Sequence, residues 1–236
     1  MISFIVPAYD EALLLGATLD AIRRAADACG EAHEVVVADD ASSDRTAEVA
    51  ERRGARVVRV AHRQIAATRN SGARAARGEL LVFVDADTLI DAAVLRAALA
   101  ALRSGAVGGG CAVRFDGSVP AYARIVTPLL VASFRTLGFA CGCFVFCTRA
   151  AFEATGGFDE KLFGAEELAF SRALARLGRF VVLRESVATS GRKMRTHTGW
   201  EILAALGKLA IRGPRSVRRR EGMEFWYGKR RVELAE

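Results

Sequence analysis

The stretch VFVDADT, residues 82–88, ends an apolar run with two carboxylates, Asp85 and Asp87. Side chains two residues apart on a β-strand point to the same side, so we expect both acids on one side of a strand terminus. Mg²⁺ and Mn²⁺ prefer such oxygen ligands and are usually held by one or two carboxylates together with substrate phosphates. The pair therefore predicts a divalent-metal site. Spacing alone leaves one alternative open, in which the acids cap a helix that begins near Thr88.

Two earlier apolar stretches also end in acidic pairs. FIVPAYDE carries Asp10 and Glu11, and EVVVADD carries Asp39 and Asp40. In open α/β sheets, ligands bind in the crevice at the carboxyl ends of the strands. We therefore expect these acids to gather with the 82–88 acids on one rim of one crevice.

The elements that would position these acids alternate along the first 105 residues. Short apolar runs predict strands, and segments with apolar residues at helical spacing predict helices between them. The predicted strands are 3–9, 34–40, 56–60 and 80–87, and the predicted helices are 12–28, 42–54, 65–78 and 88–105. Four such alternations favour an α/β fold with a mostly parallel sheet and helices on both faces.

The alternation is weaker beyond residue 105. Residues 105–115 are Gly-rich and extended in character, and residues 121–146 are the most apolar part of the chain. Arg124, Pro128 and Arg135 interrupt that part, so no window of ~20 residues spans a bilayer cleanly. We expect a core helix followed by a core strand, and the alternative is an amphipathic helix that touches a membrane surface.

Composition describes a globular protein with a basic balance. The chain has 236 residues, 52% of them hydrophobic, and a formal net charge of +7. That charge suits a polyanionic partner such as a phosphorylated substrate or an anionic membrane. The five cysteines lack the spacing of zinc sites, so reduced, buried thiols are expected. The N-terminus MISFIVPAY shows no leader, which makes cytoplasmic placement the expectation.

Three motifs occur in order along the chain: VVVADDASSD, ATRNSGARAARGELLVFVDADT and GGFDEKLFGAEELAFSRAL. Together they resemble the family 2 glycosyltransferases, which are nucleotide-sugar-dependent enzymes with the Rossmann-like GT-A fold. The resemblance covers roughly residues 1–190. It implies a nucleotide-binding half over 1–104 and an acceptor-binding half over 105–190, followed by a basic C-terminal extension over 191–236.

The resemblance also implies a role for each matching position near the donor. Asp39 would accept a hydrogen bond from the nucleotide base with Asp40 in support, and Arg69 would lie near the nucleotide. Asp85 would face the ribose, and Asp87 would ligate Mn²⁺ or Mg²⁺ on the diphosphate. The residues expected to line the base and ribose are Pro7, Tyr9 and Glu11.

An inverting transfer needs a carboxylate that takes the proton of the acceptor hydroxyl. The family commonly shows Glu-Asp at the start of a helix here, where this chain has Glu166 and Glu167. Counting back from Arg172 favours Glu166, and reading the acidic pair directly favours Glu167. By the same resemblance, His197 would add a metal ligand. Arg192 lies nearby in the sequence and is expected to neutralise the leaving diphosphate, as charged clamps do in phosphoryl chemistry.

The resulting prediction is an inverting, metal-dependent glycosyltransferase that moves one sugar from a nucleotide-diphosphate sugar, most often a UDP-sugar, to an acceptor hydroxyl. The acceptor is expected to be lipid-linked or a saccharide. The alternatives are a non-catalytic nucleotide-sugar-binding or regulatory subunit and a metal-dependent nucleotidyltransferase. The basic run with Phe225, Trp226 and Tyr227 suggests peripheral contact with the inner face of a membrane. No nucleic-acid-binding module accompanies that run, so nucleic acid is not an expected partner.

Overall fold

The computed structural model describes the chain except residues 118–119, 197–200, 202–216, 222, 224–226 and 229–236. Within the described part, the strands form a single eight-stranded sheet in the order β3-β2-β1-β4-β7-β6-β8-β5. The strands are β1 Ile2–Ala8, β2 His33–Asp40, β3 Arg56–Val60, β4 Leu80–Val84, β5 Thr88–Leu89, β6 Gly108–Phe115, β7 Phe144–Thr148 and β8 Phe180–Thr189.

The first four long strands build a parallel unit. β1 pairs in parallel with β2 and with β4, and β2 pairs in parallel with β3. β7 then runs antiparallel between β4 and β6, β6 pairs in parallel with β8, and β5 pairs antiparallel with β8. The carboxyl ends of β1, β2 and β4 therefore meet at one edge, as the sequence predicted for a mostly parallel sheet.

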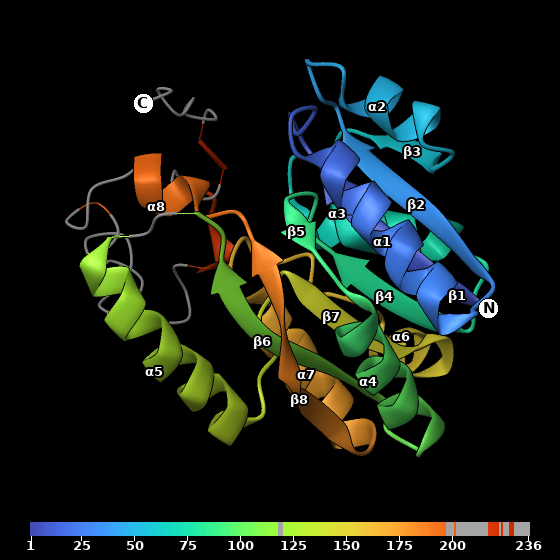
Figure 1. The fold of residues 1–236 in the computed structure, drawn as a ribbon, viewed down its shortest axis with the longest axis vertical. Helices are drawn as coiled ribbons and strands as arrows, with labels where there is room; N and C mark the ends of the chain where they lie inside the picture. Colours follow the sequence, from blue (N-terminus) through green and yellow to red (C-terminus); the bar gives the residue numbers. More distant parts are fainter. Residues whose placement is uncertain (118–119, 197–200, 202–216, 222, 224–226, 229–236) are drawn as a thin grey trace.

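Helices cover both faces of the sheet (Figure 1). The helices are α1 Leu15–Cys29, α2 Thr46–Arg52, α3 Ile65–Ala75, α4 Ala92–Arg103, α5 Ala121–Leu137, α6 Arg149–Thr155, α7 Glu166–Leu177 and α8 Arg192–Thr196. α1 and α4 share one buried apolar cluster with the sheet, and α3, α6 and α7 share the other. Strands that are buried on both faces explain the nearly continuous apolar runs in the sequence.

The helix predicted to begin at Thr88 begins later. Thr88 and Leu89 form the short strand β5, and α4 starts at Ala92. Asp91 caps α4, because its carboxylate accepts hydrogen bonds from two backbone N–H groups of the first turn. Asp85 and Asp87 are therefore not the caps of this helix, and that alternative is wrong.

The apolar segment 121–146 divides into two parts with different surroundings. The strand prediction is confirmed, since the first four residues of β7 are buried. The core-helix prediction is wrong for α5, where Leu129 is 64% and Leu137 is 65% exposed. α5 lies at the margin of the molecule, away from α1 and α4 (Figure 1). Among the described helices, none has the length and apolar content needed to cross a bilayer.

Candidate active site

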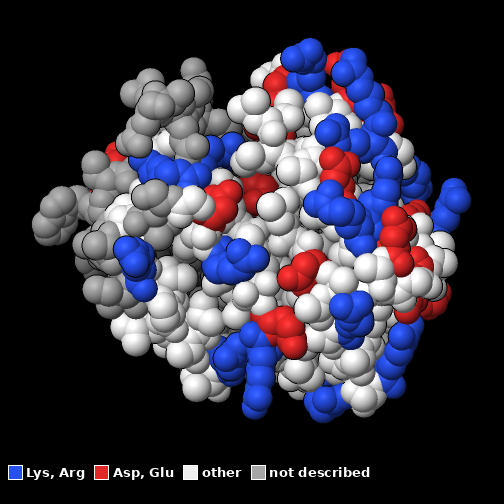
Figure 2. All heavy atoms as spheres, viewed as in Figure 1, with Lys and Arg blue, Asp and Glu red and all other residues white. Residues whose placement is uncertain are grey.

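An open pocket lies where β1, β2 and β4 end, as the rule for open α/β sheets predicts. Most of the predicted donor-binding residues come together in its wall: Pro7, Tyr9, Glu11, Asp40, Asp85 and Asp87. Basic and acidic side chains are interspersed over most of the face that Figure 2 shows.

The two acids of VFVDADT reach the pocket through a turn, not through strand alternation. β4 ends at Val84, and the N–H of Thr88 donates to the carbonyl of Asp85 at 3.0 Å. The hydroxyl of Thr18, on α1, donates to the carbonyl of Ala86 at 2.9 Å. The predicted convergence of Asp85 and Asp87 holds, but α1 and a tight turn produce it.

Arg69 connects one of these acids to the predicted catalytic pair. It is 2% exposed and donates to Asp85 Oδ1 and to Glu166 Oε1, each at 2.9 Å. It also donates to the carbonyl of Gly142 at 2.9 Å. Burial disfavours its charge, but Asp85 and Glu166 outweigh burial and raise the pKa of Arg69 above its ordinary value. Arg69 is thus a buried cation that holds two carboxylates together.

Glu166 and Glu167 begin α7 after Ala165, whose φ of 57° is left-handed. Glu166 is 5% exposed and paired with Arg69. Burial and the neighbouring Glu166 charge raise the pKa of Glu167 to about 8. Neither glutamate is among the described residues that line the pocket, and Arg69 links Glu166 to the pocket acid Asp85.

Asp39 and Asp40, the acidic pair at the end of β2, make different contacts. The Asp40 carboxylate accepts from the N–H groups of Arg63 and Gln64, at 2.8 and 3.1 Å, and from the Thr68 hydroxyl at 2.8 Å. It therefore fixes the loop between β3 and α3. Asp39 accepts from the N–H of Ser42 at 3.3 Å and is absent from the described pocket wall. The base-binding role of Asp39 stays a prediction.

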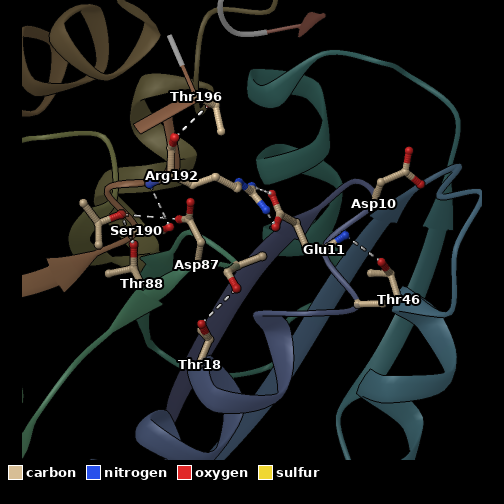
Figure 3. A network of polar contacts seen from close by, with 12 residues as sticks. Asp10, Glu11, Thr18, Thr46, Asp87, Thr88, Ser190, Arg192 and Thr196 are labelled. Atoms are coloured by element: carbon tan, nitrogen blue, oxygen red, sulfur yellow. Dashed lines mark hydrogen bonds and ion pairs between the residues drawn. The ribbon is translucent and has the colours of Figure 1, made fainter. Parts of the chain in front are cut away.

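The C-terminal extension contributes to the same site. Arg192, on α8, donates to both carboxylate oxygens of Glu11, at 2.9 and 3.1 Å. Asp87 lies beside this ion pair (Figure 3). The N–H of Glu11 donates to Thr46 Oγ1 at 2.8 Å, which fixes the loop after β1. The predicted contact of Arg192 with a diphosphate stays a prediction, and so does the boundary at residue 190.

Sequence reasoning missed several residues of the pocket wall: Arg63, Gln64, Ile65, Thr68 and Tyr227. The Tyr227 hydroxyl accepts from the N–H of Ile65 at 3.5 Å, and its ring meets the Phe163 ring edge-on at 5.9 Å. The aromatic residues of the basic tail were the available signal, but they were assigned to membrane contact. His197, Phe225 and Trp226 lie outside the described residues.

The donor set of the pocket fits a divalent cation. Asp85 and Asp87 offer carboxylate oxygens in the wall, and Arg69 occupies only Oδ1 of Asp85. Among the described residues, no group of three or more His, Cys, Asp and Glu side chains could hold a metal ion. Two carboxylates nevertheless suffice where substrate phosphates and water complete the coordination, as they commonly do for Mg²⁺.

Comparisons with known proteins agree with this geometry. The family model described as "Glycosyl transferase family 2" matches residues 3–156. The chain is 36% identical over 98 residues to the undecaprenyl-phosphate 4-deoxy-4-formamido-L-arabinose transferase of Edwardsiella ictaluri, a match that covers 36% of this chain and 29% of that protein. The chain thus spans less than a third of this curated relative.

Two solved structures share the fold. The mannosyltransferase PcManGT from Pyrobaculum calidifontis, in complex with GDP-Man and Mn²⁺, has a TM-score of 0.66 and 25% identity, over 90% of this chain and 64% of that one. Glucosyl-3-phosphoglycerate synthase from Mycobacterium tuberculosis, in complex with Mn²⁺, UDP and glucosyl-3-phosphoglycerate, has a TM-score of 0.59 and 20% identity, over 89% and 77%.

Proposed function

Because the chain belongs to glycosyl transferase family 2 and is a glycosyltransferase with the GT-A fold, we propose that its pocket binds a nucleotide-diphosphate sugar with a divalent cation. We propose further that it transfers one sugar to an acceptor with inversion. One observation carries the proposal: Arg69 ties the pocket acid Asp85 to the buried acid Glu166 in one connected cluster.

The proposed donor is a UDP-sugar, with a GDP-sugar as the next choice. Related folds supply the support, since one is known with GDP-Man and another with UDP, both with Mn²⁺. The proposed acceptor is lipid-linked or a saccharide. The relative named for undecaprenyl phosphate supports a lipid-linked acceptor, and peripheral contact with the inner face of a membrane would suit it.

Asp87 and Asp85 are the proposed ligands of Mn²⁺ or Mg²⁺, with His197 as a further candidate. A divalent cation bound there would neutralise charge on the diphosphate as it leaves. The ion pair of Glu11 and Arg192 lies beside Asp87 (Figure 3). Arg192 would add positive charge beside the leaving group, as charged clamps do in phosphoryl chemistry.

Glu166 is the proposed base. A base must be unprotonated when the acceptor hydroxyl attacks the anomeric carbon. Glu166 forms an ion pair with Arg69, whereas the raised pKa of Glu167, about 8, keeps a proton on that carboxyl at neutral pH. Glu166 would take the acceptor proton, and Arg69 would hold its carboxylate in place.

A thermal-shift panel tests donor binding. A ligand that binds only the folded state stabilises it by about 2.7 kcal/mol at a concentration of 100 times its Kd. We expect UDP or a UDP-sugar to raise the Tm of the wild type far more with Mn²⁺ than with EDTA, and Asp87→Asn to lose that difference.

Asp91→Asn is the matched control for this panel. It makes the same chemical change four residues along, at a helix cap that asparagine serves equally well. Its Mn²⁺-dependent shift should equal that of the wild type. A Mn²⁺-dependent rise in Tm that is as large in Asp87→Asn as in the wild type would contradict the proposed metal site. Nucleotide binding without any turnover would favour the non-catalytic alternative.

A further inference from the structure

Arg63 is a pocket residue to which neither the fold nor the proposed reaction assigns a role. It lies in the loop between β3 and α3 and lines the pocket together with Tyr9. Its guanidinium lies over the Tyr9 ring, 3.5 Å from the ring centroid. Within the described part of the chain, no carboxylate forms a salt bridge with it. Its N–H donors are therefore not committed to an acidic partner there.

The backbone at Arg63 is held in an unfavourable conformation. Its φ is 53°, in the left-handed region that favours glycine. The buried Asp40 carboxylate imposes this shape by accepting from the N–H groups of Arg63 and Gln64. Such strain persists only where the surroundings over-determine it, and it is concentrated at ligand sites. Here the strain places a guanidinium on an aromatic face inside the pocket.

We infer that the Arg63 guanidinium recognises the nucleotide base by hydrogen bonds, an inference that rests on the proposed donor site. A planar guanidinium stacks on rings and presents N–H donors at its edge, which suits a base that carries a carbonyl oxygen. Uracil, thymine, guanine and cytosine carry one, and adenine carries none. The Arg63–Tyr9 stack therefore selects nucleoside diphosphates whose base has a ring carbonyl, and it disfavours ADP.

The position of Arg63 favours the base over the diphosphate as its target. The guanidinium lies on Tyr9, after β1, and the backbone N–H of Arg63 donates to Asp40, at the end of β2. The proposed metal acids, Asp85 and Asp87, follow β4 instead. β2 and β4 lie on opposite sides of β1, so β1 separates the Asp40 loop from these acids.

The test uses the full chain and isothermal titration with UDP, GDP, ADP and inorganic pyrophosphate in the presence of Mn²⁺. Arg63→Gly removes the side chain and suits the left-handed backbone, so the fold should be retained. Arg63→Lys keeps the charge without the planar fork. Arg59→Ala is the matched control, because Arg59 lies on β3 and pairs with Glu51 away from the pocket wall.

We expect Arg63→Gly to weaken UDP and GDP about tenfold, the equivalent of one good hydrogen bond. ADP and pyrophosphate should be unaffected, and Arg59→Ala should match the wild type. Equal weakening of pyrophosphate and UDP would overturn the inference, because Arg63 would then bind the diphosphate. Unchanged UDP affinity in Arg63→Gly would overturn it and leave the proposed function intact. A wild type that binds no nucleoside diphosphate would overturn both.

Discussion

Replacing Arg69 by methionine probes the buried ion pairs behind the pocket. The side chains of Arg69 and Glu166 are 3% and 7% exposed, whereas that of Asp85 is 34% exposed. Breaking a buried ion pair by removing one partner costs about 3–5 kcal/mol, because the other charge is left without compensation. Water screens much of the Asp85 interaction, so Glu166 should dominate the loss.

We therefore expect Arg69→Met to lower the free energy of unfolding by about 3–4 kcal/mol in urea titrations at neutral pH. Adding Glu166→Gln removes the stranded charge and should restore part of that loss. Arg74→Met is the control on the same helix, because Arg74 pairs with Glu160 at an exposed site. It should cost less than about 1 kcal/mol.

Two results would refute this reasoning. One is a loss of less than about 1 kcal/mol for Arg69→Met, which would mean that water already compensates Glu166. The other is a double variant, Arg69→Met with Glu166→Gln, no more stable than Arg69→Met alone. Either result would contradict the proposal that Arg69 holds the Glu166 carboxylate in place.

Two further predictions concern stability. The pKa of Glu167 is raised to about 8 in the folded state. Between about pH 4.5 and 8 the folded state therefore binds more protons than the unfolded state. The free energy of unfolding should fall as pH rises through that range. Glu167→Gln should therefore have a higher Tm than the wild type at pH 8, with the gap closing toward pH 5; a gap that does not depend on pH would contradict the shift. Gly72→Ala should destabilise by about 1–3 kcal/mol despite the better helix propensity of alanine. The added methyl group would lie 2.6 Å from Cγ2 of the buried Ile5, and a thermal melt above that of the wild type would show that this contact relaxes freely.

The sequence predicted the nucleotide half of the fold because its signals are local. Apolar runs such as Phe4 to Val6 and Leu81 to Val84 are buried on both faces of the sheet, so these strands can be recognised from the sequence alone. The acids that follow them had to meet at one edge, since parallel strands share their carboxyl ends. The resemblance to a family then supplied the roles.

Long-range contacts decided what the sequence could not show. Arg69 and Glu166 lie 97 positions apart, and they form an ion pair only because the fold places α3 and α7 over the same apolar cluster. Tyr227 lines the pocket, although the sequence around it suggested a tail that contacts a membrane. α5 looked like a core helix because its apolar content is high, but its composition does not reveal which surface it leaves exposed.

The most direct test of the account follows sugar release from a UDP-sugar by NMR. A set of UDP-sugars is incubated with the wild type, Asp87→Asn and Asp91→Asn, with Mn²⁺ or EDTA, and water serves as the acceptor. The account predicts that an α-linked donor first yields the β-sugar, that release needs Mn²⁺, and that only Asp87→Asn loses it. Release with retained configuration, or equal release in EDTA and in Asp87→Asn, would contradict it.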